Sequence, residues 1–369
     1  MTAVPESPYV ESVDVAAYRI PTETPESDGT LEWSATTLLL VRVTAGASVG
    51  TGYTYADASC VPLIRDRLAP LVLGKSAWSP SVVTWALVDE CRNLGVSGLV
   101  AAAISAIDVA LYDLAARLAG VPLARLLGQV RHDIPIYGSG GFTSYSDQTL
   151  AAQLAGWADA GIPRVKMKIG RDPSGDPHRL RIARRTIGES VELFVDANGA
   201  YDPRSAVDWV RLCREEFDVR WFEEPVSSDD VKGLAFVRAR APGGIAIAAG
   251  EYGWTPWYYR AFLAAEAVDC VQVDVTRCLG ITGFLAVAGA CEVWQVDLSA
   301  HCAPQISAHA AAAVRRLRPI EYFHDHVRIE SMAFDGVLEP IDGVLRPALD
   351  APGHGLVFKE SDVEGFRVA

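Results

Sequence analysis

Three short apolar stretches of this chain each end in an acidic residue. The stretches are residues 193–196, 221–223 and 245–251, and their last carboxylates, Asp196, Glu223 and Glu251, follow one another at intervals of 27 and 28 residues. This interval is the length of one strand–helix unit in a parallel barrel, whose strands all end at the same face. We therefore expect the three carboxylates to lie together. Such a cluster needs a hard divalent cation with oxygen ligands, and it predicts a Mg²⁺ site.

The alternation of short strands and amphipathic helices continues through the chain from residue 133. Strands are predicted at residues 134–137, 164–169, 193–196, 221–223, 245–249, 270–274, 296–300 and 319–322. Helical patterns lie between them, for example at residues 150–160, 205–216 and 283–292. Eight such units favour a (β/α)₈ barrel over an open doubly wound sheet.

The part before residue 133 has a different pattern and predicts a second domain, since 369 residues exceed the length of a single barrel. Strands are expected at residues 13–20 and 35–43, and a helix at residues 101–118 that Gly120 ends. The polar stretch at residues 21–33 is a candidate mobile loop, although a solvated hairpin connection explains it equally well. The tail, residues 344–369, is expected to return to this first domain.

Charge and cysteine content narrow the class of protein. A net charge of −13 and a pI near 5.0 argue against nucleic acid or an anionic membrane surface as a partner. The seven scattered cysteines contain no Cys-x-x-Cys pair and are typical of reduced thiols. The first nine residues show no signal-peptide pattern. We therefore expect a cytoplasmic protein.

Further reactive groups are predicted at the ends of the other strands. Lys166 and Lys168 share one face of the second strand, because side chains alternate along a strand. Two neighbouring ammonium groups lower the pKa of at least one of them, which suits a general base. Asn198 follows Asp196 at the third strand. Of Glu223 and its neighbour Glu224, only one is expected to point inward.

An acid/base pair is predicted on the opposite side of the barrel. Asp274 ends the sixth strand and His301 ends the seventh, so the carboxylate can accept a hydrogen bond from one ring nitrogen and leave the other free to move a proton. Glu321 lies on the eighth strand. His324 and His326 are expected in a loop and not as metal ligands, because oxygen ligands already account for the cation.

The order Lys-x-Lys, Asp-x-Asn, Glu-Glu-Pro, Gly-Glu, Asp, His, Glu over successive strands resembles the enolase superfamily, mandelate racemase subgroup. Residues 105–114 and 126–128 are similar to the helix of its capping domain. The resemblance implies an α+β capping domain, residues 1–130, over a modified (β/α)₇β barrel, residues 131–340, whose last helix is missing or displaced. Residues 341–369 would return to the capping domain. Glu251 stands where the muconate-lactonizing branch usually has aspartate, and that branch has lysine and not histidine on the face opposite Lys168, so the chain is placed outside that branch.

The resemblance also implies a role for each motif residue. The metal ligands would be Asp196, Glu223 and Glu251. The acid/base groups would be Lys168 and the dyad of His301 with Asp274. Glu321 would donate a hydrogen bond to the enolate oxygen, which requires a raised pKa. Lys166 would contact the substrate carboxylate. Apart from the resemblance, Asn198, Tyr137 and Trp33 are candidates for substrate binding.

The implied chemistry is Mg²⁺-dependent removal of the proton α to a carboxylate, through an enolate. We expect dehydration of a sugar acid to a 2-keto-3-deoxy acid, because this is the commoner activity among similar proteins and residues 21–33 are polar. The alternative is a racemase or epimerase of a 2-hydroxy acid, with Trp33 in an apolar pocket. A non-catalytic carboxylate-binding barrel is less favoured, since it would need neither Lys168 nor His301. A homo-oligomer is expected.

Overall fold

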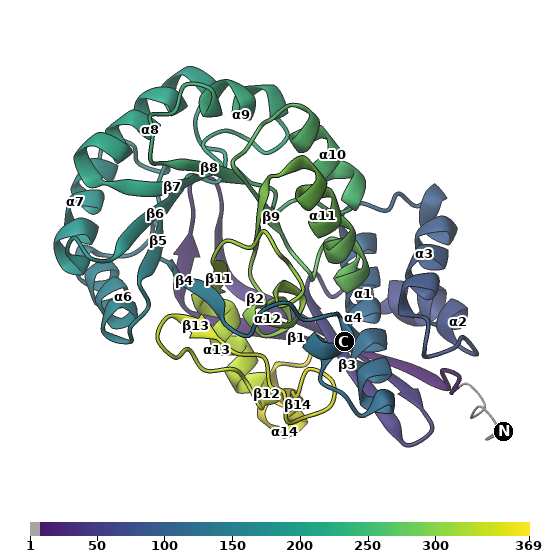
Figure 1. The fold of residues 1–369 in the computed structure, drawn as a ribbon. Helices are drawn as coiled ribbons and strands as arrows, with labels where there is room; N and C mark the ends of the chain where they lie inside the picture. Colours follow the sequence, from purple (N-terminus) through teal and green to yellow (C-terminus); the bar gives the residue numbers. More distant parts are fainter. Residues whose placement is uncertain (1–7) are drawn as a thin grey trace.

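Eight parallel strands form a barrel in the second part of the chain (Figure 1). The computed structural model describes residues 8–369, and the strands pair in the order β10–β9–β8–β7–β6–β5–β4–β11. Their bounds are β4 (Ile134–Gly140), β5 (Arg164–Lys168), β6 (Glu192–Asp196), β7 (Val219–Glu223), β8 (Ala246–Ala249), β9 (Cys270–Val273), β10 (Asp297–Ala300) and β11 (Ile320–Phe323). The predicted barrel is confirmed, and each strand overlaps its predicted range.

Single hydrogen bonds close the barrel between its first and last paired strands. Leu298 on β10 donates its N–H to Arg316 O and accepts from Arg318 N, each at 2.8 Å. Ser299 Oγ donates to Pro319 O at 2.7 Å. The segment that leads into β11 therefore binds β10, although the two strands form no regular ladder.

Seven helices follow strands β4 to β10 in turn and surround the barrel (Figure 1). They are α6 (Asp147–Asp159), α7 (Asp176–Ile187), α8 (Pro203–Phe217), α9 (Val231–Arg238), α10 (Pro256–Ala264), α11 (Gly280–Trp294) and α12 (Pro304–Ala311). The eighth, α13 (His324–Ala333), contacts the N-terminal sheet instead, where Arg328 Nη2 donates to Pro21 O at 2.8 Å. The last helix is thus displaced, as the resemblance implies.

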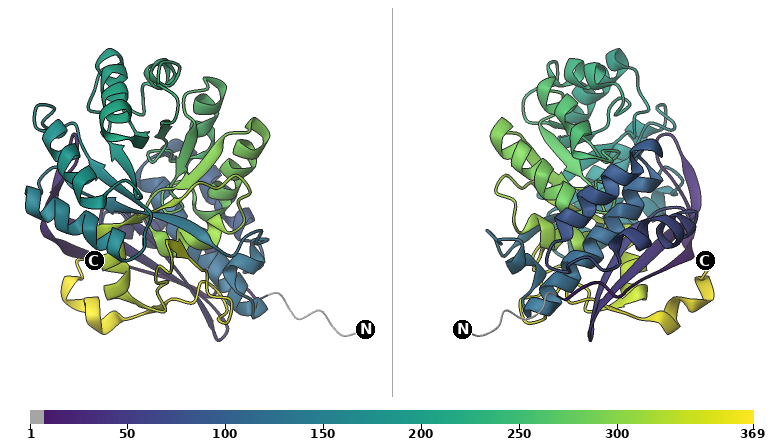
Figure 2. Two further views of the ribbon diagram at one scale, coloured as in Figure 1. Left: turned by 60° about the vertical axis from the view of Figure 1, so that its left-hand side comes forward. Right: turned by 90° about the vertical axis from the view of Figure 1, so that its right-hand side faces the viewer.

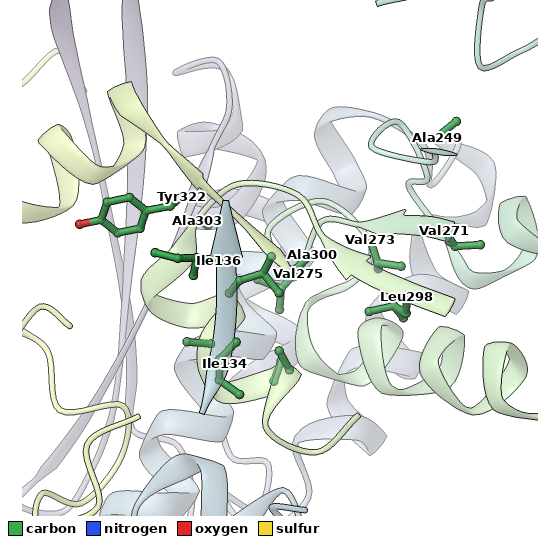
Figure 3. Packing of buried hydrophobic residues seen from close by; sticks show 14 of the residues in the cluster. Ile134, Ile136, Ala249, Val271, Val273, Val275, Leu298, Ala300, Ala303 and Tyr322 are labelled. Atoms are coloured by element: carbon green, nitrogen blue, oxygen red, sulfur yellow. The ribbon is translucent and has the colours of Figure 1, made fainter. Parts of the chain in front are cut away.

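Alternation of side chains along each barrel strand separates two cores. Outward residues such as Ile136, Val271 and Leu298 pack against the surrounding helices (Figure 3). The inward residues Tyr137, Phe194, Trp221, Ala248 and Cys270 fill the lower interior of the barrel. Because the period is two, the next inward positions belong to polar residues at the carboxyl ends of the strands.

The N-terminal domain is a three-stranded antiparallel sheet covered by helices (Figure 2). Its elements are β1 (Ser12–Ser27), β2 (Glu32–Ala45), β3 (Ser48–Tyr55), α1 (Cys60–Leu63), η1 (Ile64–Leu68), α2 (Ala69–Val72), α3 (Pro80–Glu90), η2 (Cys91–Asn93), α4 (Leu99–Ala119) and α5 (Leu123–Leu126). Gly52 lets α4 approach β3 closely, because a Cβ there would lie 2.2 Å from Ala106 O. Gly120, with a φ of 65°, ends α4.

Helix α4 has the length and hydropathy of a membrane span, but 89% of its apolar window is buried inside the protein. It packs against β2, β3, α3 and α11. Core packing therefore accounts for its apolar surface. The signal-peptide expectation concerns residues 1–9, of which residues 1–7 lie outside the described part of the chain.

Of the two interpretations of residues 21–33, the hairpin connection is confirmed and the mobile loop is wrong. Strands β1 and β2 extend through most of this stretch and leave only residues 28–31 as a hairpin tip. Trp33 Nε1 donates to the buried Glu26 Oε2 at 2.9 Å across the pair. The tip rests on the barrel, since a Cβ at Gly29 would lie 2.2 Å from Ala197 O. Pairing and this contact hold the hairpin, which sequence polarity alone does not reveal.

The C-terminal segment contacts both domains. Its elements are β12 (Phe334–Asp335), β13 (Val344–Leu345), β14 (Val357–Phe358), α14 (Glu360–Val363) and η3 (Glu364–Phe366). β13 pairs with β4 of the barrel. At the chain end, Ala17 N donates to Ala369 O at 2.9 Å and Val368 N donates to Ala17 O at 2.8 Å. The tail therefore reaches the N-terminal sheet, while the domain boundaries at residues 130 and 340 stay predictions.

Candidate active site

A cavity of about 470 Å³ lies where the carboxyl ends of the barrel strands face the N-terminal sheet. Barrel residues on its wall include Lys168, Asn198, Glu251, His301 and Glu321. The N-terminal domain contributes side chains of β1, the hairpin tip, β2 and the region after β3. The two domains together enclose the site.

Three carboxylates form a buried cluster beside this cavity. Asp196, Glu223 and Glu251 each offer an oxygen within 4.8 Å of the others. Asp196 Oδ1 accepts from Asn198 N at 2.8 Å, which orients the carboxylate. Glu251 Oε2 is buried and has no hydrogen-bond partner among the described residues. This oxygen-only set, with an unsatisfied buried oxygen, fits a hard divalent cation.

Glu224 adds a carboxylate that the sequence pattern excluded. The expectation was that only one of Glu223 and Glu224 points inward, yet both are buried. A φ of 40° at Glu224 departs from the strand conformation and breaks the alternation. Burial, with the charges of Glu251 and Asp196, raises the pKa of Glu224 well above its usual range. Glu224 therefore lies beside the cluster, and without a cation its surroundings favour the neutral form of its carboxyl group.

Lys166 and Lys168 lie on the cavity side of β5, as predicted, and bind the carboxylates. Lys166 Nζ lies 2.6 Å from Glu223 Oε1 and 2.8 Å from Glu321 Oε1. Lys168 Nζ lies 2.5 Å from Asp196 Oδ2 and lines the cavity. The two ammonium groups thus bind carboxylates of strands on both sides of β5, namely β6 and β7 on one side and β11 on the other.

The predicted lowering of a lysine pKa is wrong for the protein without a cation. Burial lowers the pKa of Lys168, but the charge of Asp196 outweighs burial and raises it above its usual value. Burial also lowers the pKa of Lys166, and Glu223 and Glu321 raise it well above the usual value. Repulsion between the two lysines is the smaller effect, because carboxylates surround both.

His301 and Asp274 form the predicted dyad. His301 Nδ1 lies 2.7 Å from Asp274 Oδ2, and His301 Nε2 lies 3.4 Å from Glu251 Oε2. Thr276 donates from its N–H and its hydroxyl to Asp274 Oδ1 at 2.7 and 2.6 Å. Burial raises the pKa of Asp274, but the hydrogen bond from His301 and the charge of Arg277 hold it below its usual range. An ionised Asp274 places the ring proton on Nδ1 and leaves Nε2 toward the cavity.

Glu321 accepts hydrogen bonds from several donors. Ser139 Oγ donates to its Oε1 at 2.6 Å, and Cys302 N donates to its Oε2 at 3.0 Å. Burial raises the pKa of Glu321, but the charges of Lys166 and His301 outweigh burial and hold it well below its usual range. The predicted raised pKa is therefore wrong, because an ionised carboxylate suits these donors.

The structure separates the expected substrate-binding residues. Asn198 and Trp33 line the cavity with Lys168. Tyr137 is fully buried, with Lys166 Nζ 5.3 Å from its ring centroid, and lies outside the cavity wall. Its expected contact with substrate is wrong, because β4 extends to Gly140 and places Ser139 at the strand end instead.

The two histidines after β11 belong to helix α13 and not to a loop. His324 Nε2 lies 3.1 Å from Glu23 Oε2 of β1. His326 is buried, stacks on Tyr55 with ring centroids 3.4 Å apart, and accepts from Ala303 N through Nδ1 at 3.2 Å. Burial lowers the pKa of His326 to about 3. His326 therefore serves as a neutral wall of the cavity.

Several cavity residues were missed by sequence reasoning. They are Arg19, Asp28, Leu31, Ala35, Thr36, Thr37, Tyr55, Ala56, Asp57, Tyr252, Arg277, Cys302 and Phe323. Most belong to the N-terminal domain or to loops, where no repeat marks a position. Cys302 and Arg277 carried a signal, since each stands within three residues of a predicted group, His301 or Asp274.

Two family models match the chain. The model described as "Enolase C-terminal domain-like" matches residues 149–362, and that described as "Mandelate racemase / muconate lactonizing enzyme, N-terminal domain" matches residues 12–128. Among curated proteins, the L-talarate/galactarate dehydratase of Salmonella typhimurium is 30% identical over 318 residues, which cover 85% of this chain and 77% of that protein.

Solved structures are similar over nearly the whole chain. A mandelate racemase/muconate lactonizing enzyme-like protein from Rubrobacter xylanophilus has a TM-score of 0.96 at 51% identity, with 98% of this chain and 100% of that chain covered. An enolase from Bradyrhizobium, complexed with magnesium and mandelic acid, has a TM-score of 0.89 at 29% identity, with 99% and 100% covered.

Proposed function

Because the chain belongs to the enolase superfamily, mandelate racemase subgroup, we propose that it is a Mg²⁺-dependent enzyme that removes the proton α to a carboxylate and dehydrates a sugar acid to a 2-keto-3-deoxy acid. The observation that carries the proposal is that Lys168 and His301 both border one cavity beside a cluster of carboxylates. The related dehydratase and the magnesium in a similar structure support it.

Asp196, Glu223 and Glu251 would hold the cation. Their oxygen donors suit magnesium, and the three carboxylates lie close together in a buried site. When bound, Mg²⁺ would stabilise negative charge on the substrate carboxylate and offset the charges that raise the lysine pKa values. Lys166 would contribute a positive charge on the side of β5.

Lys168 and His301 would act from different sides of the substrate. In the strand order, β5 and β10 are separated by β4 and β11 on one side and by the carboxylate-bearing strands on the other. Lys168, as the amine, would accept the α proton. The bond to the β-hydroxyl would then break as protonated His301 donates to the leaving oxygen, forming water, and the enol would become the 2-keto acid. Through its hydrogen bond to His301 Nδ1, Asp274 would stabilise the imidazolium before it donates this proton.

The cavity wall favours a polyhydroxy acid. Thr36, Thr37, Asp57 and Arg19 from the N-terminal domain offer hydrogen-bond donors and acceptors opposite the barrel groups. The second candidate is a racemase or epimerase of a 2-hydroxy acid, which needs the same two proton carriers but no leaving group. Trp33 and Phe323 favour this alternative, because they give part of the wall an aromatic surface.

A screen of sugar acids and aryl 2-hydroxy acids with Mg²⁺ tests the proposal. We expect a 2-keto product from at least one sugar acid and no product after chelation of the metal. Exchange of the α proton in D₂O without net product would favour the racemase. Absence of both product and exchange over the whole screen would contradict the proposed chemistry.

A further inference from the structure

Cys302 adds a sulfur atom to the wall of the cavity. Its φ of 48° and the φ of 42° at Ala303 are both left-handed. Two consecutive non-glycine residues in this region are strained and persist only where their surroundings hold them. The turn directs Cys302 N to Glu321 Oε2 at 3.0 Å and brings Sγ to 3.4 Å from the same oxygen. The position of the thiol is therefore fixed by the fold.

Three ligand atoms of different kinds meet at this point. Cys302 Sγ lies 3.2 Å from His301 Nε2 and 3.4 Å from Glu321 Oε2, and the nitrogen and oxygen are 3.6 Å apart. Ligand atoms around a tetrahedral zinc ion with ordinary bond lengths are about 3.4–3.6 Å apart. The triangle thus has nearly the size that one such ion requires. All three residues border the cavity, so a fourth position is open.

The surroundings prepare these atoms as ligands. His301 Nδ1 is engaged by Asp274 Oδ2 at 2.7 Å, which leaves the electron pair of Nε2 available. Asp274 is in turn held by Thr276. The thiol of Cys302 donates to Glu321, and an ion would replace that proton, which would leave to solvent.

We propose that His301, Cys302 and Glu321 form a second metal site, suited to a thiophilic cation such as Zn²⁺, whose occupation stops turnover. This site contains sulfur and nitrogen, whereas Asp196, Glu223 and Glu251 offer only oxygen, so the two sites prefer different cations. An ion there takes the Nε2 electron pair that proton transfer needs. The loss of turnover rests on the proposed function, but the binding of metal does not.

Cobalt binding tests the site directly. With Mg²⁺ in excess, we expect the protein to bind one Co²⁺ per chain with a thiolate-to-cobalt charge-transfer band. Cys302→Ser should abolish the band, and His301→Asn should weaken binding by about tenfold or more. The matched control is Cys91→Ser, whose thiol is buried in the N-terminal domain and should leave the band unchanged. No band in the unmodified protein, or an equal band in folded Cys302→Ser, overturns the proposal.

Inhibition by zinc tests whether occupation of the second metal site stops turnover. Turnover is measured at saturating Mg²⁺ with increasing Zn²⁺, and each variant is compared with its own rate without zinc. We expect Cys302→Ser to need about tenfold more Zn²⁺ for half-inhibition than the unmodified protein and Cys91→Ser. Equal sensitivity overturns the inhibitory role. If no substrate is turned over, the proposed function fails, and the cobalt experiment still decides the metal site.

Discussion

At the scale of single residues, Lys168 and His301 carry the proposed proton transfers, because both border the cavity and each is held by a carboxylate. We predict that Lys168→Ala and His301→Asn each lower turnover by about 10²–10⁴-fold, the usual contribution of a general acid or base. Turnover and Mg²⁺ affinity are measured separately for each variant, the affinity by calorimetry. We expect Mg²⁺ binding to persist in both variants. The control is the exposed Lys232→Ala. Activity near the unmodified level in either variant would remove that residue from the mechanism.

The residues that sequence could place are those on regular strands. Lys166, Lys168, Asp196 and Glu223 lie where alternation and the repeat predict, because each belongs to a strand of ordinary geometry. Glu224 could not be placed, since its left-handed backbone reverses the expected direction of the side chain. The charge states also escaped prediction. They depend on contacts such as Lys166 with Glu321, which join strands far apart in the sequence.

At the scale of elements, the β1–β2 hairpin forms part of the cavity wall, and its tip depends on close approach to the barrel. A Cβ at Gly29 would lie 2.2 Å from Ala197 O and 2.8 Å from Ile169 O, both backbone atoms. We predict that Gly29→Ala moves the tip and lowers kcat/KM by about tenfold to a hundredfold. Gly243→Ala is the control, since a Cβ there meets nothing within 4 Å. A change of kcat/KM no larger than in this control would show that the tip does not position the site.

Helix α13 joins the N-terminal sheet through a buried acid. Tyr53 OH donates to Glu330 Oε1 at 2.6 Å, and burial raises the pKa of Glu330 to about 8. In the unfolded chain, the pKa of a glutamate carboxyl group is about 4.3. Between these values the folded protein binds more protons than the unfolded chain, so this group makes stability fall as pH rises.

We predict that Glu330→Gln reduces this loss, because the amide stays neutral over the whole window. Free energies of unfolding are measured by denaturant titration at about pH 5 and about pH 9. The decrease in the free energy of unfolding from about pH 5 to about pH 9 should be smaller in the variant than in the unmodified protein, by an amount on the order of a few kcal/mol. An exposed change, Glu215→Gln on α8, should leave the fall unaltered. If the two variants behave alike, Glu330 does not titrate in this window.

The barrel strands could be predicted from sequence, whereas the β1–β2 hairpin could not be predicted with the same certainty. The eight barrel strands were found because short strand-like stretches alternate with amphipathic helices, and several of them end in an acidic residue. Sequence did not decide between a hairpin and a mobile loop, because residues 21–25 carry prolines and polar side chains that resemble a loop. The pairing of β1 with β2 is irregular there, with a register shift between Pro21 and Glu26. Long-range pairing, and not local propensity, keeps this stretch extended.

At the scale of the whole molecule, the two domains meet around one site, and the C-terminal segment contacts both of them away from the cavity wall. Residues from β1 to β3 face the barrel ends across the cavity, and Ala369 pairs with Ala17 on β1, an edge strand of the sheet. This arrangement explains why a motif confined to the barrel predicted the reactive groups but not the wall that selects the substrate. Homo-oligomerisation and a cytoplasmic location stay predictions.

Metal binding should stabilise the folded molecule, since the clustered carboxylates repel one another and come together only on folding. Asp196 and Glu223 are fully buried side by side, and burial together with the Asp196 charge raises the pKa of Glu223 well above its usual range. We predict that Mg²⁺ at 100 times its Kd stabilises the protein by about 2.7 kcal/mol, and that chelation reverses the gain.

Thermal unfolding with increasing Mg²⁺ measures this effect. Glu223→Gln removes one ligand charge and should weaken the response, with at least tenfold more Mg²⁺, roughly 1.4 kcal/mol of binding free energy, needed for the same shift in Tm. Glu215→Gln, an equal loss of charge on the surface of α8, should respond like the unmodified protein. An unchanged response in Glu223→Gln would identify Glu224 as the ligand in its place, because Glu224 is also buried and its carboxyl group lies close enough to Asp196 and Glu251 to feel their charges.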